Sequence, residues 1–195
     1  VIIDNILMAF ETLHYKNHHQ TGKSGFMVLK LDISKAYNCV EWKYLEQMMK
    51  RMSFVDRWVA LMMECISSVS NSILINGEPS PIIHPTRGIK QGGPLSPYLF
   101  LFCIEGLHSL LQHSAVSGQI KGVSICKKGP PLTHLFFADE SVVFCRATIF
   151  ECVKIQSIMY QYEQASGQSI NRGKTNIFFS SNTLSRTKEV ISNFL

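Results

Sequence analysis

The sequence lacks several features that define other classes of protein. It has no run of roughly eighteen uninterrupted apolar residues, which a membrane-spanning helix needs. Its start carries Asp4 and no basic residue before Phe10, unlike a secretory signal. No internal repeat, low-complexity segment or Gly/Ser-rich linker divides it. We therefore expect one domain and no membrane partner. Because there is no initiator methionine, we also expect the chain to begin inside a longer reading frame.

Cysteine is present, but not in a pattern that binds metal or predicts disulfides. The six cysteines form no Cys-x-x-Cys pair, and most lie among apolar residues. Such cysteines are typical of small, buried, reduced side chains in an intracellular protein. The sequence thus predicts an intracellular location.

The balance of charge is mildly basic. The 195 residues, 46% of them hydrophobic, suffice for one sizeable core. Lys and Arg number 19 against 14 Asp and Glu, a net charge of +5 with a pI of about 8.9. This charge is compatible with a nucleic-acid partner, but it is too small to establish one.

Apolar periodicity and turn signals predict a single α+β unit. Asn38 with Glu41 resembles a capping box, Asn76-Gly77 a hairpin turn, and Gly167 a helix C-cap. The expected helices cover 1–15, 38–52, 55–66, 96–112, 148–165 and the stretch from 184 onward. The expected strands cover 26–33, 72–75, 81–84, 119–125, 132–137, 141–146 and 176–180.

Asp32 lies at the end of a strongly apolar strand. Burying a carboxylate costs several kcal/mol unless it is paired or binds a metal, so this side chain needs a partner. It could cap a turn or pair with Lys35, and taken alone these structural roles are the more common ones.

A second acidic pair, Asp139-Glu140, lies between two apolar strands and is expected at the tip of a tight hairpin. Acidic hairpin tips are usually only solvated turns. A tip that faces Asp32 would be different, because three converging carboxylates can hold two divalent ions about 3.5–4 Å apart for in-line nucleotidyl transfer.

The third segment is a glycine-rich loop that runs from Arg87 to Pro94 and enters a helix at Ser96-Pro97. Such a loop lets backbone N–H groups approach a phosphate or a base pair closely. Arg87 and Lys90 add positive charge there. Alone, a glycine-rich loop before a helix is weak evidence for binding.

Taken together, the segments resemble the reverse transcriptases of non-LTR (LINE-type) retrotransposons, nearest to those abundant in plant genomes. The stretches LKLDISKAYN, RGIKQGGPLSPYLFLFCIEGL and THLFFADESVVFCRA are similar to the family's motifs A, B and C, in the right order and spacing. IIDNILMAFETLH, SILINGEP and SGQSINRGKTNIFFS resemble the stretches before motif A, before motif B and after motif C. The resemblance covers nearly the whole chain.

The resemblance implies a metal centre. Asp32 and Asp139 match the metal-binding aspartates, with the backbone carbonyl of Ile33 beside them. Glu140 occupies the position of the third carboxylate. The implied cofactor is Mg²⁺, with Mn²⁺ as an alternative.

The resemblance also implies residues that contact the nucleotide. Tyr37 matches the aromatic residue that lies under the incoming sugar and discriminates against a 2′-hydroxyl. Gln91 and Gly92 match the loop that packs on the nascent base pair, with Arg87 and Lys90 beside them. Lys174 matches the lysine that protonates the leaving pyrophosphate, although it could equally be a solvated lysine at a strand edge.

The implied fold is a polymerase palm, an antiparallel sheet with helices on one face. Residues 1–25 would be a remnant of the fingers, 26–180 the palm, and 181–195 the start of the next segment. The expected partners are an RNA template, a DNA primer and deoxynucleoside triphosphates, with fingers, thumb and an endonuclease from the same polyprotein. A nuclear location is implied by the family alone.

The chain departs from the family pattern at motif C, where Glu140 replaces the usual aspartate. One extra methylene moves the carboxyl group by about 1.5 Å, whereas catalytic constellations tolerate about 0.5 Å and a 1 Å misplacement costs about a hundredfold in rate. The milder departures are Asn38 and Gly93, each in place of aspartate. Two hypotheses remain: a polymerase domain that is active when its other parts are supplied, and a decayed relic that at most binds nucleic acid. A maturase-like RNA binder fits less well.

Overall fold

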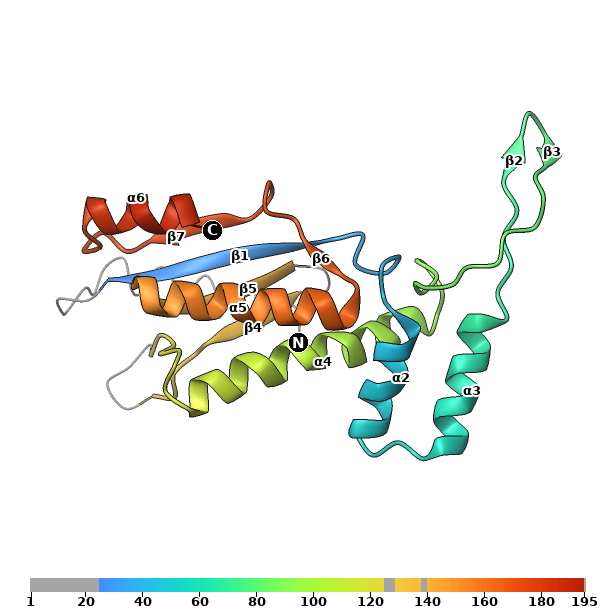
Figure 1. Cartoon of the computed structure of the whole chain (residues 1–195), viewed down its shortest axis with the longest axis horizontal. Coiled ribbons are helices and arrows are strands. Elements are labelled where there is room, and N and C mark those ends of the chain that lie inside the picture. The colour runs from blue at the N-terminus through green and yellow to red at the C-terminus, as the bar shows by residue number, and fades with distance from the viewer. Residues whose placement is uncertain (1–24, 125–128, 138–139, 195) are drawn as a thin grey trace.

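The computed structural model describes residues 25–124, 129–137 and 140–194. The helix predicted at 1–15, and Asp139, lie outside the described residues. Five strands form one antiparallel sheet (Figure 1). The central strand β1 (Phe26–Ser34) pairs on one side with β5 (Glu140–Arg146), which pairs in turn with β4 (His134–Phe137). On its other side β1 pairs with β6 (Ser169–Ile170) and β7 (Asn176–Phe179).

Helices cover one face of this sheet. In Figure 1, α4 (Ser96–Val116) and α5 (Ile149–Ser166) lie across the sheet, while α2 (Trp42–Arg51) and α3 (Asp56–Ser67) stand at one end. The last helix is α6 (Ser185–Phe194), whose Ile191 joins the main core. The predicted antiparallel sheet with helices on one face is therefore confirmed.

Alternation along β1 decides which side chains meet the helices. Met27, Leu29, Leu31 and Ile33 are at most 3% exposed and pack in the main core with the helices. Because successive strand residues point to opposite faces, Lys30 and Asp32 lie on the face without the main core, as does Val28, which joins a smaller apolar cluster.

Local deviations from the predicted elements concentrate near motif A. The helix expected from Asn38 begins at Trp42, and its N-cap residue Glu41 makes no side-chain capping bond, so the capping-box prediction was wrong. Residues 35–39 instead form a turn in which Lys35 has a positive φ of 47°. In contrast, Gly167 is a left-handed C-cap of α5 as predicted.

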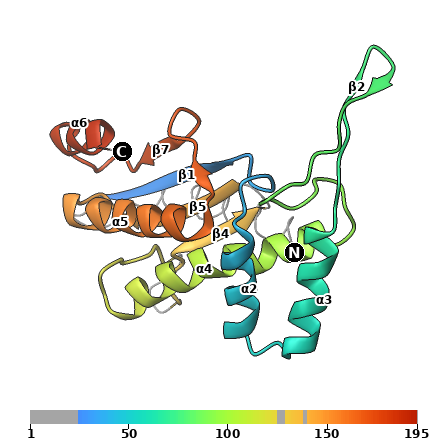
Figure 2. The ribbon, with the colours of Figure 1, turned by 45° about the vertical axis from the view of Figure 1, so that its right-hand side comes forward.

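The predicted hairpin forms around Asn76-Gly77, but it is tighter than expected. Both residues have positive φ, as a type I′ turn requires. The turn pairs β2 (Leu74–Ile75) with β3 (Glu78–Pro79), and the segment expected as the second strand, 81–84, keeps only a bridge from Ile83 to Asn71. Figures 1 and 2 show this hairpin projecting from the body.

Three further differences are small. The helix α4 runs one turn longer than predicted. The described part of the strand expected at 119–125 contributes one bridge, between Val123 and Leu132. The short strand β6 was not predicted at all.

By length and composition α4 alone among the described helices would also suit a membrane span. It packs on α2 and α5, however, and eight of its residues are buried in the protein.

Candidate active site

The pairing of β1 with β5 brings two acidic residues together. Asp32 lies directly opposite Glu140 in the antiparallel register, so both side chains leave the sheet on the same face. At the other side of β5, Glu140 pairs with Phe137. The connection between those two strands contains Asp139, which lies outside the described residues. The register therefore places Glu140 of motif C opposite Asp32, which is the condition under which the acidic pair was expected to differ from a solvated turn.

Glu140 already has a partner in this arrangement. Its Oε1 lies 2.7 Å from Nζ of Lys30, which is two residues before Asp32 and therefore on the same face of the sheet. Both side chains are about 40% exposed (41% and 44%). The proximity of Lys30 to Glu140 follows from the register of the two strands, so the sequence gives no signal of it.

The oxygen donors on this face suit a hard divalent cation. Carboxylates are the ligands that Mg²⁺ and Mn²⁺ prefer, and Asp32 and Glu140 supply two of them on adjacent strands. Within the described ranges, no three His, Cys, Asp or Glu side chains gather into a metal-binding group. Asp32 and Glu140 are two of the three carboxylates of the predicted centre, and the remaining one, Asp139, lies outside those ranges.

Tyr37 lies in the turn that follows β1. Its ring stacks on Phe100 of α4, with centroids 5.0 Å apart and planes inclined by 24°. The turn is closed by the amide of Asn38, which donates to the carbonyl of Lys35 at 2.9 Å. Tyr37 is therefore half-buried and held from below by a core residue.

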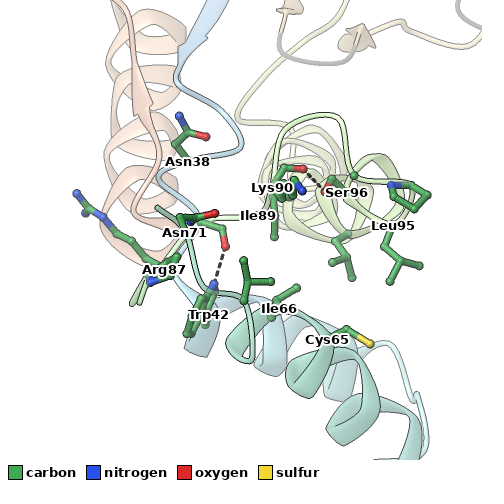
Figure 3. Close-up of a pocket in the computed structure, with 16 residues that line it drawn as sticks. Asn38, Trp42, Cys65, Ile66, Asn71, Arg87, Ile89, Lys90, Leu95 and Ser96 are labelled. Atoms are coloured by element: carbon green, nitrogen blue, oxygen red, sulfur yellow. Dashed lines mark hydrogen bonds between the residues drawn. The ribbon is translucent and has the colours of Figure 1, made fainter. Parts of the chain in front are cut away.

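The glycine-rich loop is bonded to this turn. The amide of Ile89 donates to the carbonyl of Tyr37 (2.9 Å), and the amide of Gly88 donates to the carbonyl of Val40 (2.8 Å). The indole Nε1 of Trp42 donates to the carbonyl of Gly88 at 2.6 Å, as Figure 3 shows. Motifs A and B thus form one hydrogen-bonded unit.

Gly88 is required by the closeness of this contact. Its φ is +85°, and a Cβ at this position would lie 2.6 Å from the carbonyl oxygen of Asn38. Gly92 also has a positive φ, +82°, but nothing lies within 4 Å of its Cβ direction. The first glycine therefore permits packing, whereas the second leaves the loop tip open.

The predicted nucleotide-contacting residues lie at the exposed tip of this loop. Lys90, Gln91 and Gly92 are all exposed. Arg87 instead points toward Glu41, with Nη1 3.6 Å from Oε1. Below the loop lies a cavity of about 340 Å³, lined among others by Trp42, Ile66 and Leu99 (Figure 3).

Lys174 lies in a turn that is hydrogen-bonded to the end of β1. The amide of Lys174 donates to the carbonyl of Asn171 (3.1 Å), and the amide of Asn171 donates to the carbonyl of Asp32 (2.8 Å). The side chain of Lys174 is exposed. The backbone of Lys174 thus lies near the end of β1. Proton donation by its side chain stays a prediction.

A buried glutamine that sequence reasoning missed supports the same turn. Gln168 is 1% exposed, and its Nε2 donates to the carbonyl of Ala36 at 2.5 Å. Its Oε1 accepts a hydrogen bond from the hydroxyl of Tyr162. Its position directly after the cap glycine was the only signal in the sequence, and it says nothing of a partner 132 residues away.

An antiparallel sheet with helices on one face and two facing acidic residues on the other is the arrangement expected of a polymerase palm. Residues 2–190 match the family model "Reverse transcriptase (RNA-dependent DNA polymerase)". The chain belongs to this family. Members of the family polymerise nucleotides into DNA on an RNA template and use divalent metal ions.

Related proteins agree with the non-LTR type. A mitochondrial protein of Arabidopsis thaliana is 32% identical over 110 residues, 54% of this chain and 86% of its own length. The 149 kDa protein of transposon TX1 of Xenopus laevis is 26% identical over 89% of this chain. The Pol polyprotein of the type-1 retrotransposable element R2 of Popillia japonica is 27% identical over 65%. The chain spans only 13% and 20% of these last two proteins.

The fold also matches solved structures. A telomerase of Candida tropicalis superposes with a TM-score of 0.63 over 93% of this chain, at 15% identity, and one of Candida albicans with 0.64 over 91%, at 12% identity. The chain spans 35% and 30% of those two proteins. At such low identity the likeness shows the shared fold.

Proposed function

We propose that this chain supplies the catalytic palm of a complete RNA-directed DNA polymerase that extends a DNA primer on an RNA template. The observation that carries the proposal is the register that sets Asp32 opposite Glu140 on the sheet face away from the main core. Asp32, the carbonyl of Ile33, Asp139 and Glu140 would hold two Mg²⁺ ions, or Mn²⁺ in their place. The bound ions would activate the primer hydroxyl and neutralise charge on the triphosphate.

The remaining residues have positioning roles in this proposal. Tyr37, fixed by Phe100 and by the amide of Ile89, would lie under the sugar of the incoming deoxynucleoside triphosphate. Gln91 and Gly92 would contact the new base pair, and Lys90 and Arg87 would add positive charge near phosphate. Lys174 would donate a proton to the leaving pyrophosphate. Fingers, thumb and endonuclease would come from other parts of the same polyprotein.

The second candidate is a decayed copy without catalysis, and the Lys30–Glu140 pair favours it. A glutamate held by a lysine 2.7 Å away is one methylene longer than the usual aspartate. Such a side chain would place its carboxylate away from the position that the metals need.

The test is primer extension by the palm joined to the fingers and thumb of an active relative. Three versions are compared with Mg²⁺ and with Mn²⁺: the natural sequence, Glu140→Asp and Asp139→Ala. If the palm is catalytic, the natural sequence extends the primer and Asp139→Ala does not. Activity confined to Glu140→Asp would identify a copy disabled at this side chain. No extension by any version, from a chimaera that circular dichroism shows to be folded, would count against the proposal.

A further inference from the structure

The turn that carries Tyr37 is held in an unfavourable backbone conformation. Lys35 has a φ of 47°, in the left-handed region that residues other than glycine, asparagine and aspartate rarely occupy. Such conformations persist only where surrounding contacts fix them. The contacts that fix this turn therefore decide where the ring of Tyr37 lies.

One set of contacts comes from the end of α5. The Ser166 carbonyl accepts a 2.9 Å hydrogen bond from the amide of Glu41. Gly167 approaches so closely that a Cβ there would lie 2.7 Å from the carbonyl oxygen of Cys39. Gln168 then places its amide under Ala36, the residue before Tyr37. The junction between α5 and β6 thus contacts the turn through a second set of interactions, separate from those of the glycine-rich loop.

The orientation of the Gln168 amide is fixed by its other partner. The hydroxyl of Tyr162 donates to Oε1, which leaves Nε2 as the donor to Ala36. Burial raises the pKa of the Tyr162 phenol well above its usual value, so the phenol keeps its proton and remains a donor. The backbone amide of Gln168 is bonded as well, to Oγ of Ser166 at 3.2 Å. Each polar group of this side chain has a partner, and the side chain has little freedom to move.

We propose that Gln168 is a positioning residue for Tyr37: by holding the carbonyl of Ala36, it sets the height of the tyrosine ring and hence the discrimination between deoxy- and ribonucleotides. This proposal rests on the proposed function, in which Tyr37 lies under the sugar. In the proposed function Gln168 itself contacts neither the nucleotide nor the metal ions. Its effect passes through one backbone carbonyl to the adjacent residue.

Three variants separate positioning from general stability. Gln168→Met keeps the length of the side chain and removes both hydrogen bonds, and Tyr162→Phe removes only the donor to Oε1. Ser180→Ala is the matched control, because Ser180 is also 1% exposed and hydrogen-bonded, but to Phe26 at the far end of β1. All three are expected to lower stability, and only the first two to affect the turn.

The first readout needs no activity. Hydrogen exchange of the Ile89 amide, which bonds to the Tyr37 carbonyl, is followed by NMR on the chain itself. Exchange is expected to accelerate about tenfold in Gln168→Met, because the bond to the Ala36 carbonyl is the one of the two that holds the turn and its loss costs about 1.4 kcal/mol. A smaller acceleration is expected in Tyr162→Phe. Ser180→Ala is expected to leave it within about twofold of the natural chain. Equal exchange in Gln168→Met and the natural chain would overturn the proposal, and if Gln168→Met does not fold, Tyr162→Phe decides in the same way.

The second readout is the ratio of kcat/KM for a deoxynucleotide to kcat/KM for the matching ribonucleotide. It is measured with the palm carrying Glu140→Asp and joined to the fingers and thumb of an active relative. The ratio is expected to fall about tenfold in Gln168→Met. It is expected to stay constant in Ser180→Ala, because Ser180 makes its hydrogen bond at the far end of β1 and not at the turn. An unchanged ratio in Gln168→Met would refute the role in discrimination. Complete absence of extension would instead refute the proposed function, and the exchange of Ile89 would still decide whether Gln168 positions the turn.

Discussion

Lys30 and Glu140 form an ion pair, with Nζ 2.7 Å from Oε1, on the same sheet face as Asp32. An ion pair this exposed contributes about 0–1 kcal/mol to stability. The ion pair would affect metal binding more than stability, because the ammonium group of Lys30 lies against the Glu140 carboxylate oxygen that a metal ion would need as a ligand. If Glu140 is a metal ligand as proposed, Lys30 and a metal ion would compete for its carboxylate.

We expect Lys30→Met to strengthen the binding of Mn²⁺ to the chain roughly fivefold, since removing one positive charge a few Å away is worth about 1 kcal/mol in a water-like dielectric. Electron paramagnetic resonance measures the binding directly. The matched control is Lys50→Met, which breaks the exposed Lys50–Glu46 pair on α2 and is expected to leave the affinity unchanged. Equal affinities in Lys30→Met and the natural chain would show that Glu140 is not a metal ligand.

Gly88 and Gly92 form a second matched pair. Both have positive φ, so alanine is strained at each by about 1–2 kcal/mol. At Gly88 the new Cβ would also collide with the backbone of Asn38, whereas at Gly92 the space is open. Gly88→Ala is therefore expected to lower the free energy of unfolding by at least about 1 kcal/mol more than Gly92→Ala. Urea unfolding measures both, and equal losses would contradict the contact between the loop and the turn.

His134 makes stability depend on pH. Burial, with a smaller contribution from the charge of His108, lowers its pKa from 6.5 to about 4. Between pH 4 and pH 6.5 the His134 imidazole is therefore neutral in the folded chain and takes up a proton when the chain unfolds. Its stabilising effect is thus complete above pH 6.5 and is lost as the pH falls toward 4. The shift corresponds to at most about 3 kcal/mol.

Urea unfolding at a series of pH values tests this effect. The free energy of unfolding of the natural chain is expected to fall more steeply between pH 6.5 and 4 than that of His134→Gln. The exposed His113→Gln should retain the steep dependence. Parallel curves for the natural chain and His134→Gln would contradict the proposed protonation.

Ser141 carries a buried hydroxyl without a hydrogen-bond partner among the described residues, and it is 0% exposed next to Glu140. An unsatisfied buried polar group costs about 1–3 kcal/mol. Ser141→Ala is therefore expected to raise the melting temperature by a few degrees or leave it unchanged. Ser180→Ala, which removes a bonded hydroxyl, is expected to lower it. Differential scanning calorimetry distinguishes the two, and a loss of stability in Ser141→Ala would indicate a partner for this hydroxyl.

The sequence predicted the elements whose apolar pattern is strong. The central strand was expected at 26–33 and spans Phe26–Ser34, and the helix expected at 148–165 spans Ile149–Ser166. In both, burial on one face follows directly from the spacing of apolar residues.

The elements that sequence reasoning missed are fixed by long-range hydrogen bonds. Asn38 is a good helix cap by type, but Gly88 and Ile89 bind the carbonyls of Val40 and Tyr37 and hold the backbone in another conformation. The short strand β6 has two residues and exists through its pairing with β1. For the site, the resemblance identified Asp32 and Glu140, whereas Lys30 and Gln168 required the register and the packing.

The ion pair at Glu140 also has an evolutionary consequence. Glu140 has a lysine partner on the neighbouring strand, so we expect the glutamate to cost little folding stability even where it impairs catalysis. Selection would then act against the glutamate only through reduced copying of the element that encodes it. A genome can therefore accumulate copies that are structurally sound and differ only in their capacity to replicate.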